Sequence, residues 1–117
     1  FWVTRRYSGS PIIHEGHVYL YCGDKHQCVN LETGEVKWKE TASSTITSPV
    51  LADGKLLVLE NNGSHLSITS SQPAAYRQFA RVRIDAMGCT SPALSNGRLI
   101  VRQKDKLACF DLRPLQP

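Results

Sequence analysis

The amino-acid sequence predicts an all-β fold made of repeated small antiparallel sheets, and three observations support this prediction. First, three segments align on a Pro that is followed five residues later by a Gly: Pro11 to Gly16, Pro49 to Gly54 and Pro92 to Gly97. Second, each Gly closes a short polar turn between two β-rich stretches, as a tight hairpin requires. Third, the repeats are spaced by 38 and 43 residues. A period near 40 is typical of the four-stranded blades of a β-propeller.

The first predicted element, residues 1–10, is the fourth (d) strand of a preceding blade, because Trp2 stands before the first repeat much as Trp38 stands before the second. A complete blade with strands a to d is then expected over 11–47. Its b and c strands are expected to be joined by a turn at Gly23-Asp24. The dipeptide Thr33-Gly34 forms the next turn, after which alternating residues of the d strand share one face.

A second complete blade is predicted over 48–90, with its b–c turn at Asn61-Asn62-Gly63. Its d strand is expected at Arg81–Ile84 after an irregular lead-in, although Pro73 also allows a short helical turn there. The arginines of this region are expected to form a solvated outer edge that discourages pairing with other sheets; they are Arg77, Arg81 and Arg83. Residues 91–117 supply only the a, b and c strands of a closing blade.

The expected strand order is therefore d-abcd-abcd-abc, about three blades. Three blades are too few for an ordinary closed ring, which typically has four to eight, and an open arc would expose its end faces. Two alternatives remain: a homodimer that forms a six-bladed ring, or a part of a larger propeller whose missing blades belong to the parent chain. A sandwich of about twelve strands is less favoured, because it would not require the same turn to recur at the same offset.

Composition excludes several classes of protein. Hydrophobic residues make up 41% and charged residues 21% of 117 residues, as in a globular domain. The formal net charge of +4 is dispersed along the chain and lacks interleaved aromatics, so nucleic acid is not an expected partner. The longest apolar run is Leu56–Leu59, and no membrane span is expected.

Candidate metal-binding and redox residues have simpler explanations. His14 and His17 flank a turn, and a metal site is not expected there because a third and a fourth ligand are lacking. The four cysteines lack the CxxC spacing of zinc or thioredoxin-like sites; they are Cys22, Cys28, Cys89 and Cys109. Cys28 and Cys109 occupy equivalent strand positions and are expected to be buried as small hydrophobes. The disulfide state stays open, since Cys22 and Cys28 could face each other across the b–c hairpin in an oxidising compartment.

No catalytic motif is recognised in the sequence. It has no Gly-rich phosphate loop, nucleophile elbow, HExxH motif or paired acids. The aspartates fall mostly in turns or at strand ends, where their side chains bond the local backbone. No residue is therefore assigned as catalytic, cofactor-binding or metal-binding.

The segment from Cys28 to Trp38 resembles the tryptophan-docking motif of pyrroloquinoline-quinone-like (quinoprotein-like) β-propeller repeats, Ala-x-Asp-x-x-Thr-Gly-x-x-x-Trp. Thr33, Gly34 and Trp38 match the motif. Asn30 stands where the motif has Asp, and Cys28 where it has Ala. A further stretch, CTSPALSNGRLIV at 89–101, looks like the closing blade of bacterial quinoprotein-like repeat proteins.

The resemblance implies that the docking Trp is structural and packs against the neighbouring blade. Trp2 and Trp38 would take this role, and Phe79 would replace them in the middle repeat. With the turn residues, the predicted structural repeat positions are Trp2, Gly16, Thr33, Gly34, Trp38, Gly54, Phe79 and Gly97.

The resemblance also implies a function. We expect a non-catalytic protein-binding or scaffolding module in the bacterial cell envelope, periplasmic or extracellular, with an unknown protein partner and no cofactor. The alternative is a fragment of a pyrroloquinoline-quinone-dependent alcohol or sugar dehydrogenase, with quinone and calcium in the central funnel. Those dehydrogenases carry a disulfide between adjacent cysteines near the cofactor, and this sequence has no adjacent cysteine pair.

Overall fold

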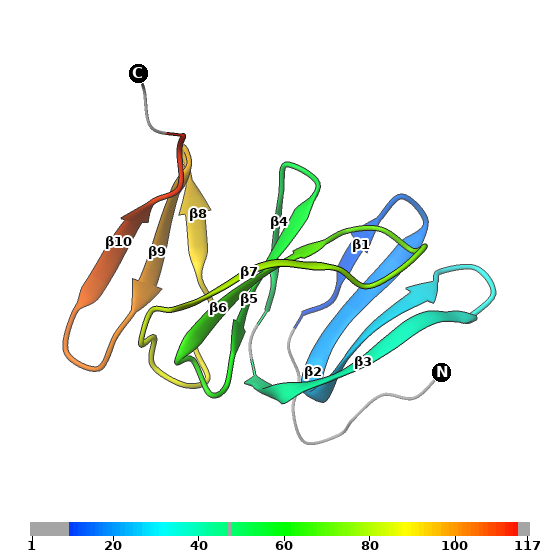
Figure 1. Cartoon of the computed structure of the whole chain (residues 1–117), viewed down its shortest axis with the longest axis horizontal. Helices are drawn as coiled ribbons and strands as arrows, with labels where there is room; N and C mark the ends of the chain where they lie inside the picture. The colour runs from blue at the N-terminus through cyan, green and yellow to red at the C-terminus, as the bar shows by residue number, and fades with distance from the viewer. Residues whose placement is uncertain (1–9, 47, 115–117) are drawn as a thin grey trace.

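The computed structural model describes residues 10–46 and 48–114, which form ten β-strands in three antiparallel sheets (Figure 1). The first sheet has the order β1-β2-β3, with β1 at Ile12–His14, β2 at His17–Asn30 and β3 at Val36–Ile46. The second has the order β4-β5-β6-β7, with β4 at Val50–Ala52, β5 at Lys55–Glu60, β6 at His65–Ser70 and β7 at Gln78–Arg83. The third has the order β10-β9-β8, with β8 at Ala93–Ser95, β9 at Arg98–Arg102 and β10 at Leu107–Asp111.

The same hairpin opens all three sheets, because the first two strands of each pair across a loop of two residues. Both loop residues have a positive φ in every copy, the geometry of a type I′ turn. The φ angles are 47° and 77° for Glu15-Gly16, 51° and 67° for Asp53-Gly54, and 50° and 76° for Asn96-Gly97. The Gly that recurs in the sequence is therefore required by the backbone geometry of one repeated turn.

Strand β5 is buried on both faces because the second sheet lies between the other two (Figure 1). Successive side chains of a strand point to opposite faces, so the apolar run 56–59 supplies both interfaces. Leu56 and Val58 pack with Tyr19, Tyr21, Cys28 and Trp38 of the first sheet. On the other face, the buried cluster towards the third sheet consists of Leu57, Leu59, Leu66, Ile84, Ala86, Leu99 and Val101.

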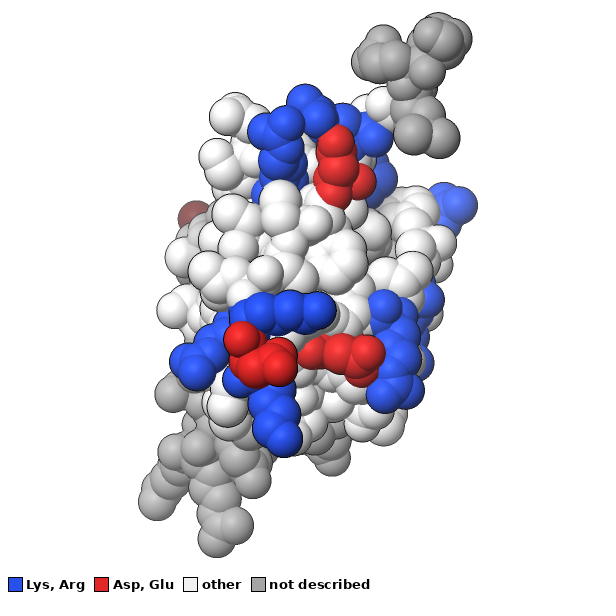
Figure 2. All heavy atoms as spheres, turned by 90° about the vertical axis from the view of Figure 1, so that its left-hand side faces the viewer, with Lys and Arg blue, Asp and Glu red and all other residues white. Residues whose placement is uncertain are grey.

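The outer face of the third sheet, which turns away from the second, is more polar than the buried faces. Positions 43 residues apart correspond in the two sheets, so Arg102 and Asp111 stand where the second sheet has Leu59 and Ile68. Ile100 is 37% exposed on this face. On this side, charged side chains gather towards the top and bottom of the view, with an uncharged band between them (Figure 2).

One predicted turn is not formed. Strand β2 continues through Gly23 and Asp24, where the sequence predicts a reversal. It pairs with β3 over 22–29, with a register shift between Gly23 and Lys25. Because β3 is long enough to bond the backbone of β2 on both sides of this shift, the chain does not need to reverse to satisfy these groups. The first sheet therefore has three strands, and only the second has the predicted four.

The predicted fold class is confirmed, since the described residues form an all-β array of antiparallel sheets arranged as in part of a propeller. The three sheets fall within the predicted ranges 11–47, 48–90 and 91–117. Residues 1–10, predicted as a separate d strand, lie almost entirely outside the described part of the chain. Within the described part there is no helix that is long and apolar enough to cross a membrane.

Candidate functional site

A cleft opens between the second and third sheets, beside their first hairpins. Its volume is about 280 Å³. Its walls are mainly apolar, formed by Ala52, Leu57, Ile68, Leu94 and Leu112, with Asp53, Lys55 and Gly97 at their edges. Pockets for small molecules usually measure about 300–1,000 Å³. The cleft therefore suits one anchoring side chain of a larger partner.

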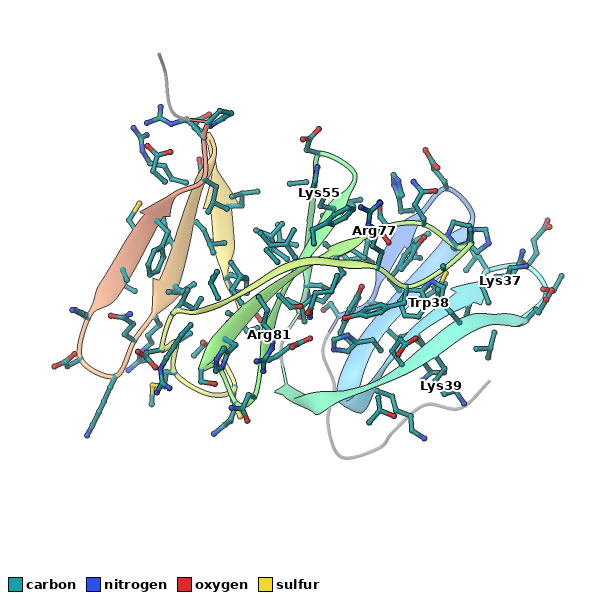
Figure 3. The ribbon with its side chains drawn as sticks, in the orientation of Figure 1. Lys37, Trp38, Lys39, Lys55, Arg77 and Arg81 are labelled. Carbon is teal, nitrogen blue, oxygen red and sulfur yellow. The ribbon has the colours of Figure 1, made fainter. Side chains whose placement is uncertain are left out.

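An exposed aromatic ring beside this cleft lies close to two cations. Phe79 is 45% exposed. Its ring centre lies 4.8 Å from Cζ of Arg77 and 5.9 Å from Nζ of Lys55. Because Lys55 also lines the cleft, this group borders the cleft on the side of the second sheet, where Lys55 and Arg77 are close together in Figure 3. The predicted docking role of Phe79 requires its ring to be buried in the core between the second and third sheets. The exposed ring is not buried there.

Trp38 on β3 joins the first sheet to the second. Its side chain is 8% exposed, and its Nε1 donates a hydrogen bond of 2.9 Å to the carbonyl oxygen of Gln72. The ring meets Tyr76 edge-on, with 5.2 Å between the ring centres. An indole buried with its one donor satisfied contributes both apolar area and direction to the contact. Trp38 therefore fixes the first sheet against the segment that connects β6 and β7.

The turn that leads to Trp38 explains why Asn30 can replace the Asp of the motif. Its Oδ1 accepts hydrogen bonds of 2.9 Å from the backbone N–H groups of Glu32 and Thr33. Thr33 Oγ1 in turn accepts a bond of 3.2 Å from the N–H of Glu35, and Gly34 has a φ of 75°. An amide oxygen closes such a turn as a carboxylate does.

A buried polar cluster lies between the first and second sheets. His26 on β2 has no exposed surface, and its Nε2 lies 3.5 Å from Oε1 of Glu60, which is also buried. Arg81 Nε donates a hydrogen bond of 3.2 Å to the other oxygen, Oε2. The imidazole is also tilted against the ring of Tyr21, with 4.4 Å between their centres. Among the described residues, both nitrogens of His26 and Oε1 of Glu60 have no hydrogen-bond partner.

Burial controls the protonation of this cluster. It lowers the pKa of His26 to about 4, because the charged imidazolium would lose its hydration. Burial also raises the pKa of Tyr21 and that of Tyr76. His26 is thus neutral near neutral pH and closed to solvent, so the cluster serves to join two sheets rather than to exchange protons with a substrate.

The histidines of the first hairpin remain at a surface turn. His17 Nδ1 lies 3.1 Å from the carbonyl oxygen of Glu15, and His14 Nε2 lies 3.8 Å from its Oε1. Among the side chains that the structure describes, no three from His, Cys, Asp or Glu are grouped as a metal site would require.

The cysteines follow the prediction only in part. Cys28 is fully buried, as predicted, but Cys109 is exposed, because none of the described strands packs on the outer face of β10. The open alternative of a Cys22–Cys28 disulfide fails, because both residues lie on β2, six positions and roughly 20 Å apart at about 3.3 Å per residue. Cys28 is a free thiol. The side chains of Cys22 and Trp2 lie outside the described part of the chain.

The arginine-rich segment forms an edge, as predicted, since β7 is the last strand of the second sheet and is exposed along its whole length. Arg83 pairs with Asp85 at 2.8 Å on this surface. Arg81 differs, because it reaches inward to Glu60.

The cleft and the polar cluster were not predicted. One signal for the cluster was present: Glu60 directly follows the apolar run 56–59 and shares a strand face with Leu56 and Val58.

Comparisons with known proteins bear on the fold. No protein-family model matches the chain, and no curated protein sequence matches it. Among solved structures, the chain is similar to the β-propeller protein BamB from Moraxella catarrhalis, with a TM-score of 0.67 and 16% sequence identity. The match covers 94% of this chain and 35% of BamB, so the chain spans about a third of that protein. This likeness shows a propeller-like fold.

Proposed function

We propose that this chain is a non-catalytic protein-binding or scaffolding part of a β-propeller in the cell envelope. The observation that carries the proposal is the apolar cleft between the second and third sheets. Lys55 at its edge lies near the exposed ring of Phe79, and Arg77 lies over that ring. Aromatic and arginine side chains beside an apolar depression are enriched at protein interfaces and dominate their binding energy. Because packed sheets hold the cleft on both sides, little conformational freedom is lost when a partner binds.

Two likenesses support the proposed role and compartment. The structural similarity to BamB supports a protein-binding or scaffolding role. The resemblance of the segment from Cys28 to Trp38 to quinoprotein-like repeats supports a bacterial periplasmic or extracellular location.

Site-specific photo-crosslinking tests the proposal. A benzophenone amino acid placed at Phe79 should crosslink a discrete protein in cells of the source organism, and the product should appear in the envelope fraction. The same group at Lys39, an exposed position on β3, should give no such product. The purified partner should then bind the purified chain. A crosslink pattern that is the same from Phe79, Lys39 and Ile100 would contradict a specific binding surface.

A quinone titration separates the proposal from an enzymatic function. Pyrroloquinoline quinone with calcium is added to the purified chain, and absorbance and dye reduction with alcohols and sugars are followed. We expect no saturable binding and no turnover. Stoichiometric binding with dye reduction would replace the proposed scaffold with the dehydrogenase alternative.

A further inference from the structure

The charges beside the cleft distinguish between kinds of protein partner. Arg77 forms no ion pair within the described part of the chain, and its guanidinium lies over the ring of Phe79. Among the described residues, Lys55 has one carboxylate neighbour, Asp53, at 3.5 Å, and the side chain of Asp53 is 97% exposed. Pairs between such exposed groups contribute little. Both cations can therefore bind carboxylates of a ligand.

We propose that the cleft binds an extended acidic peptide segment, which inserts one apolar side chain and places its carboxylates against Lys55 and Arg77. This inference rests on the proposed function and names the chemistry of the partner. The apolar walls and the volume of about 280 Å³ fit an anchoring side chain. The two cations outnumber the single carboxylate at the edge of the cleft, that of Asp53, so the border is net positive and selects for negative charge next to that anchor by electrostatic complementarity.

Phe79 contributes by orienting Arg77. A guanidinium held over a ring keeps N–H donors free to bond both oxygens of one carboxylate. The contact with the ring also reduces the rotational freedom that Arg77 would otherwise lose on binding. Phe79 is thus a positioning residue for the cation and an apolar contact for the peptide.

The test uses two labelled hexapeptides with the same apolar centre, acetyl-Asp-Glu-Leu-Phe-Asp-Glu-amide and acetyl-Lys-Lys-Leu-Phe-Lys-Lys-amide. Fluorescence polarisation measures their binding to the whole chain. We expect the acidic peptide to bind at least about tenfold more tightly than the basic one, a difference of about 1.4 kcal/mol. Its affinity should fall when ionic strength rises from about 0.05 to about 0.5 M, because salt screens exposed charges.

Variants locate the site. Arg77→Glu should weaken the acidic peptide at least about tenfold, because it replaces attraction with repulsion. Leu112→Asn should weaken it by a similar factor through loss of the apolar wall, without adding a charge. Lys39→Glu makes the same change in net charge on β3, away from the cleft (Figure 3), and should change affinity less than about twofold. Arg77 and Leu112 are exposed side chains, and circular dichroism melting verifies that each variant folds. The milder Arg77→Gln replaces Arg77→Glu if that variant melts early.

Three outcomes would overturn the inference: no binding of the acidic peptide, equal binding of both peptides, or an equal loss in Lys39→Glu. Binding to anionic phospholipid vesicles without binding to the acidic peptide would also overturn it. The proposed function can survive this failure. A partner that crosslinks from Phe79, but is not displaced by the acidic peptide, would support the protein-binding function and refute the acidic chemistry.

Discussion

The indole Nε1 of Trp38 donates a hydrogen bond of 2.9 Å to the carbonyl oxygen of Gln72, and this bond ties the first sheet to the connection between β6 and β7. Tyr76, on the same connection, meets the indole edge-on. The connection leads directly into β7, on which Phe79 borders the cleft. The docking contact therefore holds in place the strand that forms one side of the proposed binding surface.

Replacing Trp38 should destabilise the chain in two steps. Trp38→Phe keeps most of the buried ring but leaves the Gln72 carbonyl without its donor, and should reduce the free energy of unfolding by about 1–2 kcal/mol. Trp38→Ala also leaves a cavity and should cost about 3–5 kcal/mol. Urea denaturation followed by circular dichroism measures both. As a control on the same strand, Val36→Ala should cost less than about 1 kcal/mol, since Val36 is 37% exposed. Equal losses at Trp38 and Val36 would contradict the docking role.

Stability should depend on pH through His26. Its pKa in the folded chain, about 4, lies below the usual histidine pKa of 6.5, so folding favours the neutral ring. The stabilisation is complete above about pH 6.5 and is lost as the pH falls towards 4. A difference of this size corresponds to about 3 kcal/mol, at 1.36 kcal/mol for each pKa unit. Urea denaturation at a series of pH values between 4 and 7 measures the loss.

His26→Phe isolates this effect from the carboxylates that titrate in the same range. Phe removes the titrating ring and its unsatisfied nitrogens but keeps an aromatic side chain against Tyr21. The variant should lose most of the decline in stability between pH 6.5 and 4. If wild type and variant decline in parallel, His26 does not become charged on unfolding in the way that its burial requires.

The fold was predictable because its evidence is local and repeated. A two-residue turn with two positive φ angles favours Gly, Asn or Asp. The same turn occurs in all three sheets, so Gly16, Gly54 and Gly97 recur at equivalent positions of the sequence repeat. The buried faces of β5 were predictable in principle from the apolar run 56–59. Periodicity alone, however, cannot show which sheet each face contacts.

The candidate site was not predictable, because it depends on contacts between sheets. Alignment placed Phe79 in the docking role, but β7 has a register shift opposite Ile68 and Thr69, and the exposed ring lies near two cations instead. The Gly23-Asp24 dipeptide is a strong turn signal, yet pairing with the long β3 keeps β2 extended there. In both cases tertiary pairing outweighed a local preference.

The burial of the Glu60 carboxylate should be tolerated only because Arg81 pairs with it, so the loss of Arg81 should lower the free energy of unfolding. The Glu60 side chain is 4% exposed, and Arg81 is its one charged hydrogen-bond donor within the described residues. Arg81→Met leaves the carboxylate buried beside a neutral imidazole and should cost about 2–3 kcal/mol, less than for a fully buried pair because Arg81 is 37% exposed. Urea denaturation of single and double variants measures the coupling. The double variant Arg81→Met with Glu60→Gln should recover much of the loss, since no uncompensated charge remains. Strictly additive losses would show that the two groups do not interact.

The turn at Gly63 should tolerate no side chain, because it supports the connection to the third sheet. Gly63 has a φ of 95°, and a Cβ there would lie 2.5 Å from the carbonyl oxygen of Ala86, which is backbone and cannot move aside freely. The Ala86 N–H also donates a hydrogen bond of 2.8 Å to the Gly63 carbonyl, so the two segments are held together. Gly63→Ala should cost about 3 kcal/mol and lower the melting temperature by about 10–20 °C.

Gly54→Ala is the matched control, since Gly54 has a φ of 67° and open space around its Cβ position. It should cost only the backbone strain of about 1–2 kcal/mol. Equal melting temperatures for the two variants would mean that the close approach of Gly63 to Ala86 does not contribute to stability.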